Sequence, residues 1–265
     1  MQFAQITDIH LVPRGQSLHG LDPVQRFEDC IADVNRHSDD LQFCAITGDL
    51  ADRGDVDSYG VLREILQTLT VPAHLILGNH DRREAFLKIF PEAPRDSNGF
   101  IQYQVNSTGG LLVFLDTLDE GKSSGIYCNR RRQWLVDRLQ EAGDRPVYLF
   151  MHHPPFDIGL PSLDRMKLDA ADSFATSIEV NSNIRHLFFG HVHRPLSGSW
   201  RNIPFSALPG TNHQIATDFK TVTPMPYSHG PAAYAFVHLD HDLNLVHLHH
   251  YLDDYPRRGD QNWNG

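Results

Sequence analysis

The strongest constraint on how this chain can fold is one pattern that recurs along its first two-thirds. Short apolar runs rich in β-branched residues are each followed at once by polar residues, in three cases beginning with a glycine. The five polar segments are Asp8-Ile9-His10, Gly48-Asp49, Gly78-Asn79-His80-Asp81, His152 and Gly190-His191-Val192-His193. In open α/β sheets, functional side chains gather at the carboxyl ends of the strands. The pattern therefore predicts a sheet edge at which these five segments meet.

The spacing of apolar residues between these segments predicts strands and helices in alternation. Helices are expected at residues 23–37, with Asp22 as N-cap and Pro23 at the first position, and at 57–69, 82–90 and 129–142. Strands are expected at residues 3–7, 43–47, 73–77, 100–105, 111–116, 147–151, 187–189, 205–208, 234–239 and 245–250. The alternation indicates βαβ units, and the β-rich later part indicates a second sheet packed on the first.

Length and charge narrow the class of protein. The 265 residues suffice for one α/β domain with a substantial core. A formal net charge of −10 argues against nucleic acid or an anionic membrane as partner, because both call for basic patches. The chain starts without a basic or apolar leader, and its apolar runs are too short to span a bilayer. We therefore expect a cytoplasmic protein, with Cys30, Cys44 and Cys128 as reduced thiols and a disulfide or redox role as the alternative.

The five segments offer carboxylate, imidazole and amide groups but no thiolate. This donor set suits two divalent cations such as zinc, manganese, iron or cobalt, and it argues against a Cys-rich structural zinc site. Asp49 is the natural bridging ligand, and two cations held close together are a standard device for hydrolysing phosphate esters. His80 has the context of a group that stabilises the transition state or protonates the leaving alkoxide, with Asp81 setting its tautomer.

Taken one at a time, these residues have other interpretations. Asp8 and Asn79 are also typical of turns, and His10 and His193 could be solvated histidines. Their joint occurrence in one order favours the metal site. His153 follows His152 on an extended run and should point to the opposite side. It therefore either contacts substrate or lies away from the site. His213 lies in a glycine-containing loop that could face the site or lie away from it.

Two further groups favour structural roles. Histidines 238, 241, 247, 249 and 250 partly alternate with leucines, which is typical of a polar sheet face. Arginines 130–132 open a helix, which favours a solvated face.

The motifs Asp8-x-His10, Gly48-Asp49-Leu50-x-Asp52, Gly78-Asn79-His80-Asp81, His152-His153-Pro154-Pro155 and Gly190-His191-x-His193 together resemble those of the calcineurin-like metallophosphoesterase superfamily. The resemblance covers about residues 1–215. Within the superfamily the chain is most similar to bacterial class III cyclic nucleotide phosphodiesterases and the related glycerophosphodiesterases. The runs at residues 150–155 and 208–214 carry that finer similarity.

The resemblance implies an α/β fold, a four-layer α-β-β-α sandwich with two mixed sheets, and two divalent metal ions, with manganese or iron favoured. Carried onto matching positions, it implies that Asp8, His10 and His193 hold the first metal ion, that Asn79, His152 and His191 hold the second, and that Asp49 bridges the two. Catalysis is expected from His80 and Asp81, and substrate contact from Asn79, His80, His153 and His213.

The expected function is a phosphodiesterase that hydrolyses small organic phosphodiesters, such as glycerophosphodiesters and also cyclic nucleotides, by attack of metal-bound hydroxide. A 3′,5′-phosphodiesterase specific for cyclic nucleotides is the alternative, ahead of a nuclease or a non-catalytic scaffold. We expect residues 1–210 to form the catalytic domain. Residues 211–265 should complete the sheets, supply a cap or the contact of a homodimer or larger homo-oligomer, and end in a polar tail.

Overall fold

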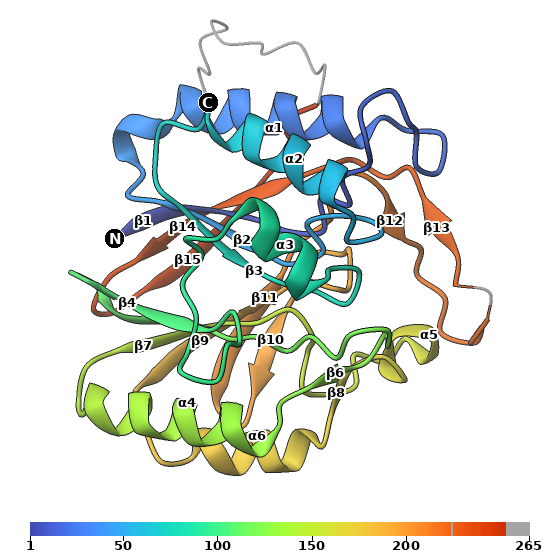
Figure 1. The fold of residues 1–265 in the computed structure, drawn as a ribbon. Helices are drawn as coiled ribbons and strands as arrows, with labels where there is room; N and C mark the ends of the chain where they lie inside the picture. Colours follow the sequence, from blue (N-terminus) through green and yellow to red (C-terminus); the bar gives the residue numbers. More distant parts are fainter. Residues whose placement is uncertain (224, 253–265) are drawn as a thin grey trace, which may run out of the picture.

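The computed structural model describes residues 1–223 and 225–252, and it contains two large β-sheets packed face to face (Figure 1). The strands of the first sheet are β1 (Gln2–Ile6), β2 (Cys44–Thr47), β3 (Ala73–Ile76), β14 (Tyr234–Leu239) and β15 (Asn244–His249), in the order β15-β14-β1-β2-β3. Strands β1, β2 and β3 run parallel, and β14 pairs antiparallel with both β1 and β15. The last part of the chain therefore lies at one side of the sheet that the first part begins.

The second sheet is also mixed. Its strands are β4 (Tyr103–Ser107), β5 (Gly110–Phe114), β7 (Val147–Phe150), β9 (Ile184–Phe189), β10 (Leu196–Trp200) and β11 (Ile203–Ala207), in the order β10-β11-β9-β7-β5-β4. Its four inner strands run parallel, and β4 and β10 close the edges in antiparallel pairs. Two short pairs lie outside both sheets: β6 (Gly125–Ile126) with β8 (Leu168–Asp169), and β12 (Gln214–Ile215) with β13 (Tyr227–Ser228).

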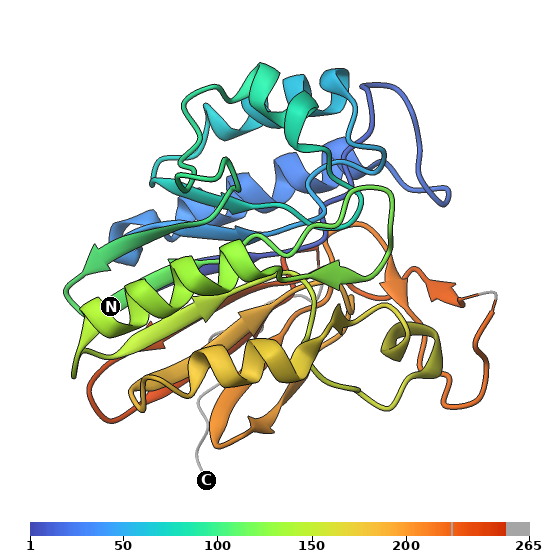
Figure 2. The same cartoon turned by 60° about the horizontal axis from the view of Figure 1, so that its bottom comes forward.

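Helices cover both outer faces, which gives the expected four layers (Figure 2). The first sheet carries α1 (Pro23–Arg36), α2 (Val56–Leu66) and α3 (Arg83–Ile89), and the second carries α4 (Asn129–Ala142) and α6 (Ala171–Ile178). Shorter turns are η1 (Ser38–Asp40) and α5 (Pro161–Asp164). As predicted, Pro23 opens α1, and Asp22 caps it by accepting from the N–H groups of Val24 and Gln25.

Three apolar clusters hold the layers together: one between each sheet and its helices, and one between the sheets. In the central cluster, Phe3 stacks on Phe43 with ring centroids 4.6 Å apart, and Phe150 stacks on Phe188 at 4.8 Å. Burial of each such ring contributes on the order of 2–3 kcal/mol. The sheets are therefore fixed face to face, so the ends of their strands have defined positions relative to one another.

The structure departs from the expectations at several points. Strand β10 and helix α6 were not predicted: the segment Leu196–Trp200 lacks β-branched residues and forms a strand by pairing with β11. Arg131 is 4% exposed rather than solvated. Its guanidinium donates to the carbonyls of Asp116 and Leu118 and lies over the ring of Phe100, because the buried loop carbonyls need donors.

The cysteines are free thiols, with Cys30 and Cys44 buried and Cys128 half-buried. No helix in the described ranges has the length and apolar character needed to cross a bilayer. The expected polar tail at residues 253–265 lies outside the described residues.

Candidate metal centre

The ends of β1, β2, β3, β7 and β9 bring the five polar segments together, although the strands belong to two different sheets. The backbone at this point is unusual. Five of the expected ligands have left-handed φ angles: Asp8 (53°), His10 (47°), Asp49 (50°), His191 (69°) and His193 (46°). Such conformations cost energy for non-glycine residues and concentrate at functional sites. The strained turns point to a site that the surrounding fold holds in place.

Two glycines make room for the ligands. A Cβ atom at Gly78 would collide with the Asp49 carboxylate and the His152 imidazole, and one at Gly190 would collide with the hydroxyl of Thr7. Both glycines have allowed backbone angles, so their role is close approach rather than turn geometry.

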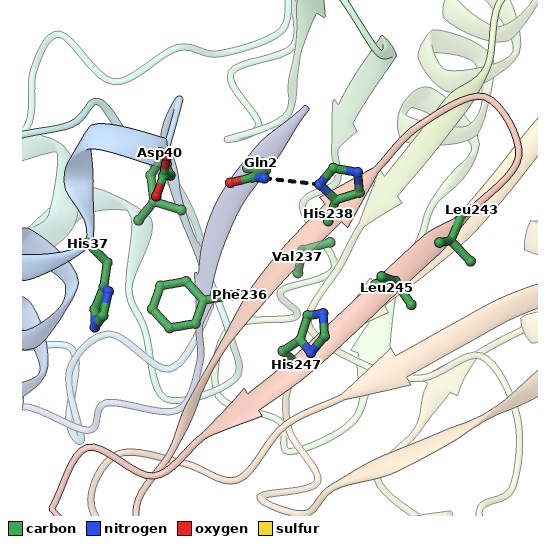
Figure 3. A pocket seen from close by; sticks show the side chains of 10 residues that line it. Gln2, His37, Asp40, Phe236, Val237, His238, Leu243, Leu245 and His247 are labelled. Carbon is green, nitrogen blue, oxygen red and sulfur yellow. Dashed lines mark hydrogen bonds between the residues drawn. The ribbon is translucent and has the colours of Figure 1, made fainter. Parts of the chain in front are cut away.

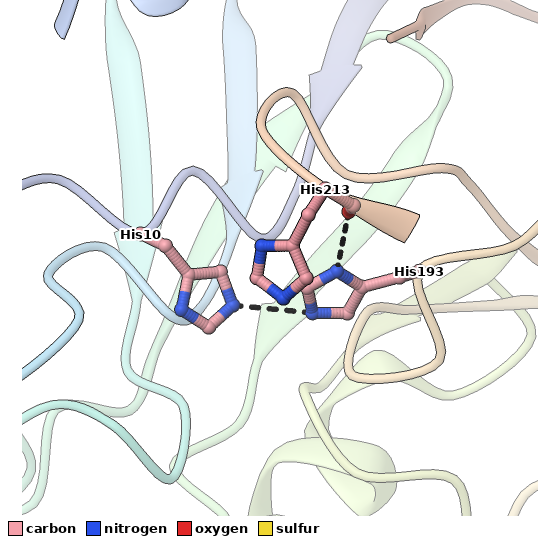
Figure 4. A group of neighbouring side chains, drawn as sticks. All are labelled: His10, His193 and His213. Atoms are coloured by element: carbon pink, nitrogen blue, oxygen red, sulfur yellow. Dashed lines mark hydrogen bonds between the residues drawn. The ribbon is translucent and has the colours of Figure 1, made fainter. Parts of the chain in front are cut away.

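One cluster of ligand atoms is formed by Asp8, His10, Asp49 and His193, all buried and within 4.8 Å of one another. The Nε2 atoms of His10 and His193 face each other at 3.1 Å, and Nε2 of His193 lies 3.3 Å from Oδ1 of Asp8. Figure 4 shows the rings of His10 and His193 with that of His213 beside them. The expected ligands of the first cation therefore converge.

The expected ligands of the second cation also converge. Oδ1 of Asn79 lies 2.9 Å from Nδ1 of His191 and 3.2 Å from Nε2 of His152. Oδ2 of Asp49 lies 3.3 Å from Nε2 of His152 and 3.5 Å from Nε2 of His10. Asp49 thus stands between the two clusters, which is the position of a bridging carboxylate.

The hydrogen bonds of two imidazoles test whether these residues fit cations. Nδ1 of His152 donates to the carbonyl of Thr47, and Nδ1 of His193 donates to the carbonyl of His213, both at 2.8 Å. Because a carbonyl only accepts, each Nδ1 carries a proton, and each Nε2 points at the cluster, where a bound cation would take the place of any proton on it. Converging lone pairs of nitrogen and oxygen suit divalent cations. The residues therefore fit two such ions.

Burial and mutual charge set the protonation of the centre. Burial would lower the pKa of His152, but the adjacent Asp49 carboxylate outweighs it and raises that pKa to about 9. Burial lowers the pKa of His10 and of His191. The pKa of Asp49 lies well below its usual range: burial opposes the charge, but His152 and the other imidazoles outweigh it. The shared carboxylate is therefore ionised, and the raised pKa of His152 reflects a negative charge that a bound cation would meet in place of the proton.

His80 lies at the mouth of the centre, with 39% of its side chain exposed. Its Nδ1 lies 2.7 Å from the carbonyl of Asp52, and its backbone N–H donates to Oδ1 of Asp49 at 2.9 Å. The expectation that Asp81 sets the tautomer of His80 is therefore wrong, because the Asp52 carbonyl holds that position. Sequence analysis quoted Asp52 within a motif but gave it no role.

Asp81 has a different task. Its carboxylate accepts from the backbone N–H groups of Leu50, Ala51 and Gly78 and from the hydroxyl of Tyr59. The three backbone donors belong to the loops after β2 and β3, and Tyr59 belongs to α2. Asp81 therefore ties together the two loops that carry Asp49 and Asn79.

The two uncertain histidines both lie at the centre. The ring of His213 is 7% exposed, and its centroid is 4.6 Å from that of His193. His153 is fully buried, with Nδ1 2.8 Å from the hydroxyl of Thr117 and its ring 4.8 Å from that of His191. The fold packs both rings against rings of the expected ligands.

Comparison with known proteins bears on this centre. Residues 1–195 match the model of the calcineurin-like phosphoesterase family. A probable cyclic nucleotide phosphodiesterase of Rhodopseudomonas palustris is 41% identical over 259 residues, covering 97% of this chain and 94% of that protein. A glycerophosphodiester phosphodiesterase of Enterobacter lignolyticus is 28% identical over 220 residues, covering 81% and 79%.

Solved structures share the fold at lower identity. A dimetal phosphatase from Danio rerio superposes with a TM-score of 0.71 at 14% identity, covering 95% of this chain and 96% of that one. From the family match and the 41% identical relative, the chain belongs to the calcineurin-like phosphoesterase family.

Proposed function

We propose that the protein is a metal-dependent phosphodiesterase that hydrolyses small organic phosphodiesters at a centre of two divalent cations. The observation that carries this is the Asp49 carboxylate, which stands between two groups of converging imidazoles. The relatives named above are phosphodiesterases of two substrate types, which supports the same reaction class.

Each residue of the centre has a role in this proposal. Asp8, His10 and His193 hold one cation, Asn79, His152 and His191 hold the other, and Asp49 is shared. When bound, the two cations supply Lewis-acid polarisation of the phosphoryl group and activation of water. Manganese and iron are the ions we favour, since the donor set lacks thiolate.

His80 acts on the leaving group. Its Nδ1 is held by the Asp52 carbonyl, which leaves Nε2 to donate a proton to the departing alkoxide or to stabilise its charge. Its partial exposure lets alcohols of different sizes leave. Asn79, His153 and His213 complete the contacts to substrate.

Three arginines near the centre are engaged by other protein groups, which favours diesters over monoesters. Arg14 pairs with Glu28 and Glu64, and Arg26 and Arg194 donate to main-chain carbonyls. A monoester dianion has an extra charge that additional cationic groups usually meet. A diester monoanion can be bound by the two cations alone.

A substrate panel tests the proposal. The manganese-reconstituted protein is assayed with cyclic nucleotides, a glycerophosphodiester and an aryl phosphodiester, each against a matched monoester. We expect the larger kcat/KM for every diester, because this constant reports differential transition-state binding. Faster turnover of the monoesters would overturn the proposal. Strong selectivity for one cyclic nucleotide would instead favour the alternative of a 3′,5′-cyclic nucleotide phosphodiesterase, which the R. palustris relative supports.

The assembly and compartment are parts of the same proposal. We infer a homodimer or larger homo-oligomer through the segment after Gly210, where Phe219 and Met225 are exposed. Light scattering at micromolar concentration tests this, and a monodisperse monomer would refute it. The free thiols of Cys30 and Cys44 suit a reducing compartment, which favours the cytoplasm.

A further inference from the structure

A continuous row of aromatic rings runs from the metal ligands to the protein surface. The ring centroid of His10 lies 4.6 Å from that of His80 and 5.0 Å from that of His213. His213 lies 4.5 Å from His19, and His19 lies 4.1 Å from Tyr227. His213 is buried, whereas His19 is exposed and Tyr227 is 51% exposed. The row therefore ends in an accessible pair of rings beside the centre.

The backbone holds His19 in a conformation that is costly for a non-glycine residue. Its φ is +54°, and together with Gly20 it forms the tight turn between Leu18 and Leu21. The carbonyl of His19 also accepts a hydrogen bond from Nε2 of His229 at 2.7 Å. Strain of this kind persists only where neighbouring contacts maintain it, and it clusters where ligands bind.

Tyr227 reaches the centre on the hairpin that begins beside His213. It lies on β13, paired with Ile215 of β12, and Ile215 follows His213 by two residues. This hairpin projects from the sandwich in Figure 1. No cation ligand lies on it, so its ring contacts are not needed to bind the cations.

We propose that Tyr227 and His19 form a subsite that stacks on a planar ring in the alcohol part of the ester, such as a nucleobase. The subsite rests on the phosphodiesterase function proposed above and names the class of diester it favours. The Tyr227 ring lies 6.4 Å from that of His213, which lies 5.0 Å from that of the ligand His10. A ribose and its base can bridge this span while the phosphate lies at the cations. A glycerol group has no ring to stack and gains nothing from it.

The experiment uses the full chain reconstituted with manganese. Tyr227→Leu keeps apolar bulk but removes the ring, and Tyr227→Phe keeps the ring. For each protein, kcat/KM is measured with 3′,5′-cyclic AMP and with glycerophosphoethanolamine. We expect Tyr227→Leu to lower the ratio of the two constants about tenfold, mainly through KM for the cyclic nucleotide, and Tyr227→Phe to restore it.

A matched control and a binding measurement make the result decisive. Phe219→Leu changes another exposed aromatic residue of the same hairpin, and it should leave the ratio of the two kcat/KM values unchanged. Calorimetric titration with AMP should show binding about tenfold weaker for Tyr227→Leu than for wild type. An unchanged ratio, or an equal loss for both esters, overturns the subsite and leaves the phosphodiesterase standing. If wild type cleaves neither ester, the function fails instead, and the AMP titration still decides the subsite.

Discussion

Two clusters in the described part of this molecule bring a buried aspartate and histidines together, but they differ in where the ring protons point. At Asp33, on α1, the carboxylate accepts from the hydroxyl of Tyr234 and from Nε2 of His249, both at 2.8 Å, and it also contacts Arg36. At Asp49, Nδ1 of His152 and Nδ1 of His193 donate outward to backbone carbonyls, and their Nε2 atoms face inward.

The direction of these protons separates the two functions. The Asp33 carboxylate is satisfied by protein donors and ties α1 to β14 and β15, so its cluster stabilises the fold. In the Asp49 cluster, nitrogen and oxygen ligand atoms converge from several separate loops, an arrangement that cations satisfy. Proximity of aspartate and histidine therefore does not identify a metal centre, whereas the pattern of outer hydrogen bonds does.

A pocket near the Asp33 cluster supports the same distinction. Figure 3 shows it on the outer face of the first sheet, with His37, Phe236, His238 and His247 among its lining residues. It lies beside Gln2, the first residue of β1, whereas Asp8 follows the other end of that strand. His238, which pairs with Gln2, lies at the end of the sheet away from the cations, whereas His249, which pairs with Tyr234, lies toward the end of β1 that Asp8 follows. These histidines contribute to a partly polar sheet face, as expected.

The largest effect should come from Asp49→Ala. It removes the one carboxylate shared by both clusters, so we expect kcat/KM to fall by at least about a thousandfold and the bound metal to be lost. Elemental analysis and kinetics check this. Asp240→Ala, which removes an exposed carboxylate near His238, is the control and should keep both metal and activity. If Asp49→Ala still bound two ions, Asp49 would not be a shared metal ligand, and its cluster would no longer differ in function from the Asp33 cluster.

His80→Ala should lower turnover by about 10²–10⁴-fold, the range of general acid–base catalysis, and leave metal content unchanged. The loss should shrink for esters with good leaving groups, since these need less protonation. Matched alkyl and aryl diesters measure this. Equal losses on both would leave charge stabilisation as its role, and loss of a metal would make His80 a ligand.

Asp33→Ala should lower the free energy of unfolding by about 3 kcal/mol, because Tyr234 and His249 lose the acceptor of their buried hydrogen bonds. Metal content and kcat/KM per folded molecule should stay as in wild type. Urea unfolding with a chelator present measures the free energy of unfolding. Elemental analysis and a kinetic assay without the chelator measure metal content and kcat/KM. If this variant lost a cation, the Asp33 cluster would be a metal site as well.

A buried histidine without a carboxylate should give the smallest effect at neutral pH, because it changes stability only in acid. His186 lies between the sheets, with Nε2 2.9 Å from the hydroxyl of Ser206, and burial lowers its pKa to about 4. Between pH 6.5 and about 4, His186 is protonated in the unfolded chain but neutral in the folded chain. Stability is therefore full above pH 6.5 and falls as the pH drops, by up to about 3 kcal/mol.

His186→Gln should remove that part of the pH dependence. Urea unfolding of metal-free protein across this pH range, compared with wild type, isolates it from the cation ligands. His247→Gln changes an exposed histidine and serves as the control. Identical slopes for wild type and His186→Gln would show that His186 takes up a proton in the folded state.

Much of this protein follows from local sequence. The N-cap at Asp22, the apolar period of α1 and the β-branched runs before the ligands are local features, so elements such as α4 and β14 were predicted with their observed bounds. The ligand segments were also recognisable, because each follows a strand. The family motifs added the pairing of the ligands into two groups.

Only the tertiary structure decided how these residues work. That His80 is held by the Asp52 carbonyl and that Asp81 binds three backbone N–H groups depends on loops from different strands meeting in space. The burial of Arg131 and the contact between His19 and Tyr227 arise in the same way. The sequence by itself determines which chemical groups are present and how they are spaced along the chain. Packing between distant segments determines where each proton and lone pair points.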